Sequence, residues 1–251
     1  MKKNVLLVVV LFLALFTYAT ENQLIIAKAN KAYAEGLFTN AVDLYKQVLN
    51  SGNESWEVYY NLGNSYYKMN DFASAILFFE KAKKLNPGNE DINFNLKVTN
   101  NKIADKIEPL PEMFYKRWYR NLVELFPVDP WARITILTFI LSLFFALFYV
   151  ISQRVYLRKM GFWAGILFFI VSLMSVHFTF QNYKTLQNNT EAIIFTPTVT
   201  VKSSPDEKSI DLFVLHEGTK VKILDNIGNW YEIRIASGSV GWLPVSSVEK
   251  I

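Results

Sequence analysis

The 251-residue chain contains no cysteine and only two histidines. Without cysteine there is no disulfide framework, no thiolate chemistry and no lipoprotein acylation site. The sequence also has no glycine-rich phosphate loop, and none of its serine, histidine or carboxylate groups falls in a nucleophile or metal-ligand pattern. We therefore expect no catalytic residue, no metal and no cofactor, and an enzyme is the least favoured function.

Acidic residues are missing from the most apolar parts of the chain. Residues 1–19 and 131–180 contain lysine and arginine but no aspartate or glutamate, whereas the remaining segments are about neutral. The sequence pI near 9.0 therefore comes from the apolar segments. A nucleic-acid-binding protein concentrates its basic residues on a folded module, so we expect no nucleic-acid partner.

The first 19 residues, MKKNVLLVVVLFLALFTYA, have the three-part plan of a secretory signal. Two lysines precede an apolar run from Val5 to Phe16 that is short for a membrane span, and the small residues Thr17 and Ala19 follow it. We predict a signal peptide over residues 1–19, cleaved after Ala19; an uncleaved anchor is the alternative. Either way the next segment is exported, and export without cysteine favours a bacterial periplasm.

The segment after the signal contains an internal repeat with a period of 34 residues. Superposition at this offset matches small and aromatic residues at equivalent positions: Asn30 with Asn64, Tyr33 with Tyr67, Phe38 with Phe72, and Ala41 with Ala75. The unit WEVYYNLGNSYYKMNDFASAILFFEKAKKLNP resembles the tetratricopeptide family. We expect repeats over 22–55 and 56–89 and a capping helix before Pro109, all within 20–109. Gly63 and Ala75 are expected at the helix crossing.

The resemblance implies a partner-binding groove lined by the first helix of each pair. Asparagine can bond an extended peptide backbone, because its side chain both donates and accepts. The residues carried over by position are Asn30, Tyr33, Tyr60, Asn61, Asn64, Tyr67 and Lys68, with Asn95 and Lys102 from the capping helix. The alternative is that these side chains form an ordinary solvated surface. So short an array is expected to be completed by a partner.

Residues 112–127 form a separate amphipathic segment. On a helical wheel its aromatic and aliphatic residues fall within one half-turn, and its charged residues fall on the other. A basic polar face opposite an aromatic face suits a helix in the lipid headgroup layer. The expected membrane-interface residues are Trp118, Leu122, Lys116, Arg117 and Arg120. Packing of this helix against the repeats is the alternative.

Two long uncharged runs follow, and each is just long enough to cross a bilayer as a helix. We predict spans over 131–152 and 162–180, joined by a loop over 153–161 that carries Arg154, Arg158 and Lys159. Loops rich in basic residues stay in the cytoplasm. Since the signal already exports the repeats, the hairpin returns the C-terminus to the same, periplasmic, side.

Residues 191–251 show short alternating strands separated by glycine, asparagine and serine turns. The stretches LHEGTKVKIL, NWYEIRI and GWLPVSSV resemble the bacterial SH3 family. The resemblance implies a five-stranded, partly open barrel with a ligand face around Trp230, Trp242 and Pro244, for a cell-wall peptide or a partner protein. Packing of both tryptophans into the barrel is the alternative.

The expected fold is multi-domain: an all-α tetratricopeptide repeat array, a transmembrane helical hairpin and a small all-β SH3-like barrel. This order of parts resembles the BatE-type members of the Bacteroides aerotolerance (Bat) family. The resemblance implies an inner-membrane adaptor beside von Willebrand factor A-type membrane proteins and a MoxR-type ATPase, acting in stress tolerance. The partners expected are therefore membrane or periplasmic proteins and the bilayer. A cell-wall sensor or anchor, with the SH3-like domain on peptidoglycan, is the alternative function.

Overall fold

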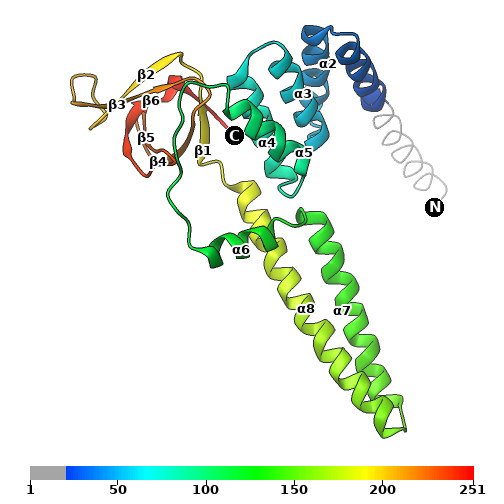
Figure 1. Ribbon diagram of the computed structural model, residues 1–251. Coiled ribbons are helices and arrows are strands. Elements are labelled where there is room, and N and C mark those ends of the chain that lie inside the picture. Colours follow the sequence, from blue (N-terminus) through cyan, green and yellow to red (C-terminus); the bar gives the residue numbers. More distant parts are fainter. Residues whose placement is uncertain (1–20) are drawn as a thin grey trace, which may run out of the picture. The chain divides into compact units, whose positions relative to one another are not determined.

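The computed structural model describes residues 21–251, so the signal-peptide prediction for 1–19 lies outside the described residues. The chain divides into two compact units. One holds the described residues up to Lys83 together with Glu90–Leu110 and Thr190–Ile251, and the other holds Lys84–Asn89 and Pro111–Asn189. Figure 1 labels the elements along the chain.

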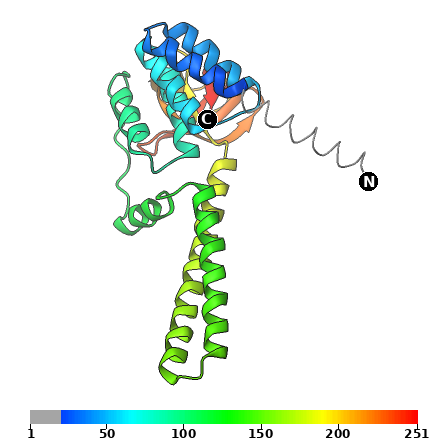
Figure 2. The same cartoon turned by 90° about the vertical axis from the view of Figure 1, so that its right-hand side faces the viewer.

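The first unit begins with paired antiparallel helices (Figures 1 and 2). A helix over residues 21–34 is followed by α2 (Phe38–Asn50), α3 (Trp56–Lys68), α4 (Phe72–Leu85) and α5 (Glu90–Asn100). Ser55 caps α3, because its hydroxyl accepts the Val58 N–H at 3.2 Å. Asp71 does the same before α4, where it accepts from the Ser74 N–H at 3.0 Å. These caps fix where each helix of the second pair starts.

The helix crossing lies at the two small residues that the repeat predicts. A Cβ atom added to Gly63 would lie 2.7 Å from Cδ1 of Phe79, which is closer than side chains tolerate. Ala75, Leu62 and Phe79 are all fully buried in the surrounding core. The absence of a side chain at Gly63 therefore lets α3 approach the aromatic ring of α4.

The β module of the same unit is a seven-stranded antiparallel sheet in the order β3-β2-β6-β5-β4-β1-β7. The bounds of its strands are β1 Glu191–Ile194, β2 Thr198–Lys202, β3 Asp211–His216, β4 Lys220–Ile227, β5 Trp230–Arg234, β6 Val240–Pro244 and β7 Val248–Lys250. Its core is built from alternate residues such as Tyr231, Ile233 and Leu243. The expectation of five strands is therefore corrected to seven, since β1 and β7 pair with each other at one end of the sheet.

The second unit contains a short helix and a long helical hairpin. Its helices are α6 (Phe114–Val123), α7 (Val128–Ile151) and α8 (Val155–Gln187). In both views α7 and α8 lie side by side (Figures 1 and 2). Small residues bring them close: the Ser142 hydroxyl donates to the Gly165 carbonyl at 3.0 Å, and that of Ser172 donates to the Thr135 carbonyl at 3.3 Å.

Both long helices are apolar enough to cross a membrane. The most apolar windows of α7 and α8 have mean hydropathies of 2.6 and 1.9, and only 11% and 28% of these windows are buried within the protein. The core helix of a soluble protein would be mostly buried, whereas these two helices leave most of their apolar surface uncovered. The turn is shorter than the loop expected over 153–161, because α8 already begins at Val155 and places Arg158 and Lys159 in its first turns.

Candidate functional site

The concave side of the helical array holds a cavity of about 300 Å³. It is lined mainly by aromatic and amide side chains: Tyr33, Tyr60, Asn64, Tyr67, Lys68, Phe79, Asn95, Val98 and Thr99. This volume is at the lower end of the range for ligand pockets, about 300–1,000 Å³. It accommodates one or two side chains of a bound segment rather than a whole cofactor.

Asparagine and tyrosine side chains along this groove are hydrogen-bonded to one another. At one end, Asn30 Oδ1 accepts from the Tyr45 hydroxyl at 2.6 Å and from Asn61 Nδ2 at 3.4 Å. At the other, Asn95 Nδ2 donates to the Tyr60 hydroxyl at 3.0 Å and to Asn64 Oδ1 at 2.8 Å. Each network holds an amide plane in one orientation, so the groove is preorganised.

One donor and one acceptor of the second network remain available. Within residues 21–251, the side-chain nitrogen Nδ2 of Asn64 and the side-chain oxygen Oδ1 of Asn95 have no hydrogen-bond partner. Both residues line the cavity and are half-buried. An adjacent donor and acceptor match the C=O and N–H of a peptide backbone, which presents one of each per residue.

Two tyrosines at or next to the groove have raised pKa values. Burial, and secondarily the neighbouring Tyr60, raise the pKa of Tyr33 above its ordinary value. Burial likewise raises the pKa of Tyr45 to about 12, with a smaller contribution from Tyr33. Lys68 is the basic residue of the lining and is exposed, so it gives the groove a positive rim.

Sequence reasoning identified most of the lining and missed part of it. Lys102 is exposed and lies outside the cavity, while Asn30 and Asn61 border it through their mutual hydrogen bond. Phe79 was missed because it belongs to the second helix of its pair, and an apolar residue there is expected in the core. Val98 and Thr99 follow Asn95 by one turn of α5, and that spacing on the same helix face was the available signal.

A second candidate surface lies on the outer face of the β module. In the β5–β6 pair, Trp230 lies opposite Pro244, and Glu232 lies opposite Trp242. Directly opposed residues share a face of the sheet, so both tryptophans and Pro244 lie together, each half-buried. Ile227 pairs with Trp230 on the same face and is 51% exposed. The three predicted residues thus form one apolar surface strip.

Comparison with known protein families identifies a family for each of the two folded modules. Residues 56–89 match the tetratricopeptide repeat. Residues 197–249 match the bacterial SH3 domain. A search of curated proteins found no match. The sequence predictions of a tetratricopeptide array and a bacterial SH3 domain are confirmed, and both families are non-catalytic modules.

Helix α6 leaves only part of its predicted apolar face exposed, because Leu122 is half-buried and packs against the core formed by Val123, Trp131 and Phe178. Phe114 and Trp118 are 84% and 67% exposed, so the described residues 21–251 leave this side of α6 uncovered. On its polar side, Arg120 forms an ion pair with Glu112 at 2.7 Å. Lys116 and Arg117 are exposed beside this pair.

The end of α6 is fastened to the long hairpin of its own unit. Asn182 of α8 is buried and donates to the carbonyls of Val123 and Phe126 at 3.0 and 2.9 Å. The Trp131 indole N–H donates to the same Val123 carbonyl at 3.0 Å. These bonds satisfy carbonyls that a helix C-terminus leaves without partners.

A histidine of α8 takes part in the same attachment. The ring Nε2 of His177 lies 2.7 Å from the Tyr119 hydroxyl of α6, and the two rings are also in contact. Nothing local in the sequence marks His177 and Tyr119 as partners, because they are 58 residues apart. Asn182 was missed for the same reason.

Proposed function

We propose that this protein is a membrane-anchored adaptor that holds an extended segment of a partner protein in its tetratricopeptide groove. The observation that carries the proposal is the available donor of Asn64 beside the available acceptor of Asn95. Such a pair recognises a backbone amide without demanding a particular sequence. The match to the tetratricopeptide family supports protein binding as the general role.

The chemistry of the lining suggests what the bound segment contains. The aromatic walls formed by Tyr33, Tyr60 and Tyr67 suit a bulky apolar side chain beside the recognised amide. Lys68 at the exposed edge suits an acidic residue of the segment. The segment we propose is therefore extended, with an apolar anchor and a carboxylate close to it.

Anchoring is supported by the two apolar helices and by α6. The windows of α7 and α8 leave most of their apolar surface for lipid. The uncovered aromatic face of α6, around Phe114 and Trp118, suits the headgroup layer, and Lys116 and Arg117 suit anionic lipid phosphates. We place the basic turn around Arg158 in the cytoplasm and both soluble modules in the bacterial periplasm, in agreement with the predicted signal peptide.

The order of the modules supports a narrower role in the cell. The chain resembles BatE-type proteins in the order of its modules: a signal segment, tetratricopeptide repeats, an interface helix, a two-span hairpin and a C-terminal SH3 domain. We therefore place the protein in an inner-membrane stress-tolerance complex of the aerotolerance type. Its partners there are von Willebrand factor A-type membrane proteins.

A second candidate function is a cell-wall sensor or anchor, for which the outer face of the SH3 domain is the reason. Trp230, Trp242 and Pro244 form a half-buried apolar strip on a bacterial SH3 domain. Flat aromatic surfaces of this kind suit sugar rings and short peptides, both components of peptidoglycan.

Affinity purification of the intact protein from membranes distinguishes the two functions. The adaptor function predicts a stoichiometric protein partner whose recovery falls about five- to tenfold for Asn64→Ala, since one backbone-directed hydrogen bond of about 1 kcal/mol is lost. Lys31→Ala, on an exposed surface, is the matched control. Co-sedimentation with purified peptidoglycan that Trp230→Ala abolishes, together with the same protein recovery from Asn64→Ala and Lys31→Ala, would instead establish the cell-wall function.

A further inference from the structure

The tetratricopeptide array is incomplete at its C-terminal end. Helix α5 occupies the position of the first helix of a third pair, and after Asn100 the chain turns over residues 101–104 and forms no further helix or strand before Phe114. In a repeat array each unit packs on its neighbours, so the last unit needs a cap over its apolar face. The apolar face that α4 and α5 present here must therefore be covered by another element.

The C-terminal module of the same unit covers it. Ile193 of β1 and Ile251 at the chain terminus belong to the buried core that contains Ile76, Phe79 and Leu96 of the array. Ile193 is fully buried. Strand β1 thereby serves two cores, because its flanking residues Ala192 and Ile194 point the other way, into the core of the SH3 domain.

The segment that follows α5 packs along the SH3 domain in the same interface. Asp105 Oδ2 accepts from the Thr219 hydroxyl at 2.6 Å and from the His216 backbone N–H at 2.7 Å. Asp105 Oδ1 lies 2.7 Å from Nδ1 of the His216 ring. Farther along, Ile107 packs against the SH3 core, and the Leu110 N–H donates to the Ala236 carbonyl at 3.2 Å. Residues 103–110 are thus held between the β3–β4 turn and the β5–β6 turn.

Charge and shape at the interface are complementary. Lys220 forms ion pairs with Glu80 of α4 at 3.0 Å and with Glu191 of β1 at 2.8 Å. Burial works against the charged form of Lys220, but the two carboxylates raise its pKa above the ordinary value.

Gly218 has a φ of +86°, and a Cβ there would lie 2.5 Å from Cγ2 of Ile103. Glycine is therefore needed at this turn for both conformation and contact.

We propose that the SH3-type domain has a second function: it is the terminal cap of the repeat array, replacing the second helix of the third pair. A partner is then not needed to complete the array, contrary to the expectation from its length. The cap leaves the groove open, because the residues that line the cavity all come from the helices of the array and none of them from residues 190–251. The aromatic strip at Trp230 also stays accessible.

Hydrogen exchange of the full chain in lipid nanodiscs tests the cap. Ile193→Ser removes an apolar contact from the array core, so amide exchange in α4 and α5 should accelerate by about tenfold or more while β5 and β6 stay protected. Ile227→Ser makes the same chemical change at a 51% exposed position and should change neither region. Unchanged exchange in α4 and α5 with Ile193→Ser would overturn the proposal.

A second variant keeps the test decisive if Ile193→Ser loosens the SH3 domain as well. Lys220→Met removes the ion pairs with Glu80 and Glu191 without altering either apolar core. Faster exchange in α4, with β5 and β6 still protected, supports the cap. If α4 exchanges at the wild-type rate in Lys220→Met, the domain is only an adjacent module and not a cap.

Discussion

A single added methyl group at the helix crossing gives the sharpest test of how the array is packed. Gly63 lies inside α3, where replacing glycine with alanine ordinarily stabilises a helix by about 0.8–1.0 kcal/mol. Here the new Cβ would lie 2.7 and 2.8 Å from two carbons of the Phe79 ring. That ring is fully buried and packs 5.8 Å from Tyr60, centroid to centroid, so it has little room to move.

The sign of the stability change caused by Gly63→Ala shows whether helix propensity or overpacking against Phe79 dominates. Overpacking a tight core contact costs about 1–3 kcal/mol, which exceeds the helix-propensity gain. We therefore expect Gly63→Ala to lower the free energy of opening of α3 and α4 by about 1 kcal/mol. Because Phe79 is also a wall of the cavity, the same change should disturb the groove.

Hydrogen exchange of α3 and α4 in the full chain measures this free energy. A matched comparison introduces Gly63→Ala into a Phe79→Leu background, where the ring is gone. There the substitution should be neutral or stabilising, giving a coupling free energy between the two positions above about 0.5 kcal/mol. A stabilising Gly63→Ala in the wild-type background would refute the close crossing.

Three further predictions concern topology, the interface helix and pH. Cysteines at the exposed positions Asn53 and Ser203 should react with a membrane-impermeant thiol reagent in intact spheroplasts, and one at Gln153 should not; labelling at Gln153 alone would reverse the topology. Asn182→Ala should speed amide exchange at the end of α6 more than Tyr119→Phe does, since it removes two bonds rather than one; equal effects would argue against the buried amide as the main attachment. Burial opposes ionisation of Asp105, but hydrogen bonds from Thr219 and His216 lower its pKa below the ordinary value of about 3.9. Its stabilisation of the SH3 domain is therefore complete above about pH 4 and is lost as the pH falls through the lower folded value; thermal melting of Asp105→Asn between pH 3 and 7 should lack this acid-dependent loss.

The modules could be predicted from the sequence because their signals are local or periodic. The 34-residue offset that matches Tyr33 with Tyr67 predicts the helix pairs, and alternation around Tyr231 predicts the strands. The start of α8 could not be placed, because Arg158 and Lys159 favour a helix as readily as a loop. A hydrophobicity pattern shows where an apolar run begins and ends, but the helix can extend beyond that run into polar residues.

The interface between the array and the SH3 domain could not be predicted for a different reason. Its contacts join residues far apart in sequence: Asp105 and Thr219 are 114 positions apart, and Glu80 and Lys220 are 140 apart. Nothing local marks Asp105 as a hydrogen-bond acceptor for a distant turn. Ile193 illustrates the same limit, since alternation places it on the outer face of β1 and only the fold shows what covers that face.

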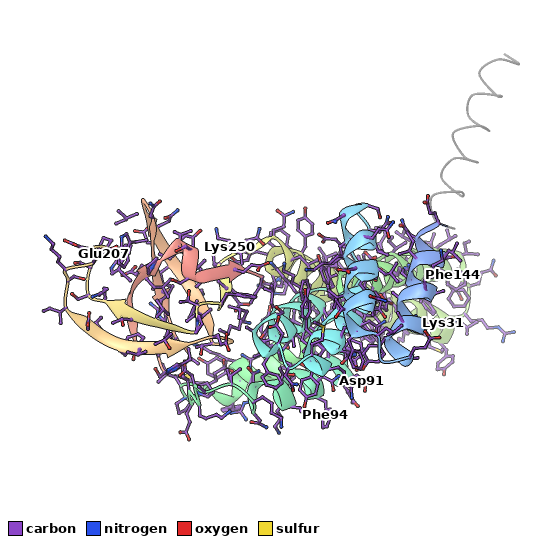
Figure 3. All side chains as sticks on the ribbon, turned by 90° about the horizontal axis from the view of Figure 1, so that it is seen from above. Lys31, Asp91, Phe94, Phe144, Glu207 and Lys250 are labelled. Carbon is purple, nitrogen blue, oxygen red and sulfur yellow. The ribbon has the colours of Figure 1, made fainter. Side chains whose placement is uncertain are left out.

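Site-specific photo-crosslinking in growing cells tests the adaptor function most directly. A photoreactive phenylalanine analogue at Tyr67 lies in the groove, whereas the same analogue at Phe94, which is 66% exposed, points outward from α5 (Figure 3). The adaptor function predicts a discrete protein adduct from position 67 that position 94 does not give, and that Asn64→Ala diminishes. The absence of an adduct at position 67, or the same adduct at both positions irrespective of Asn64, would contradict it.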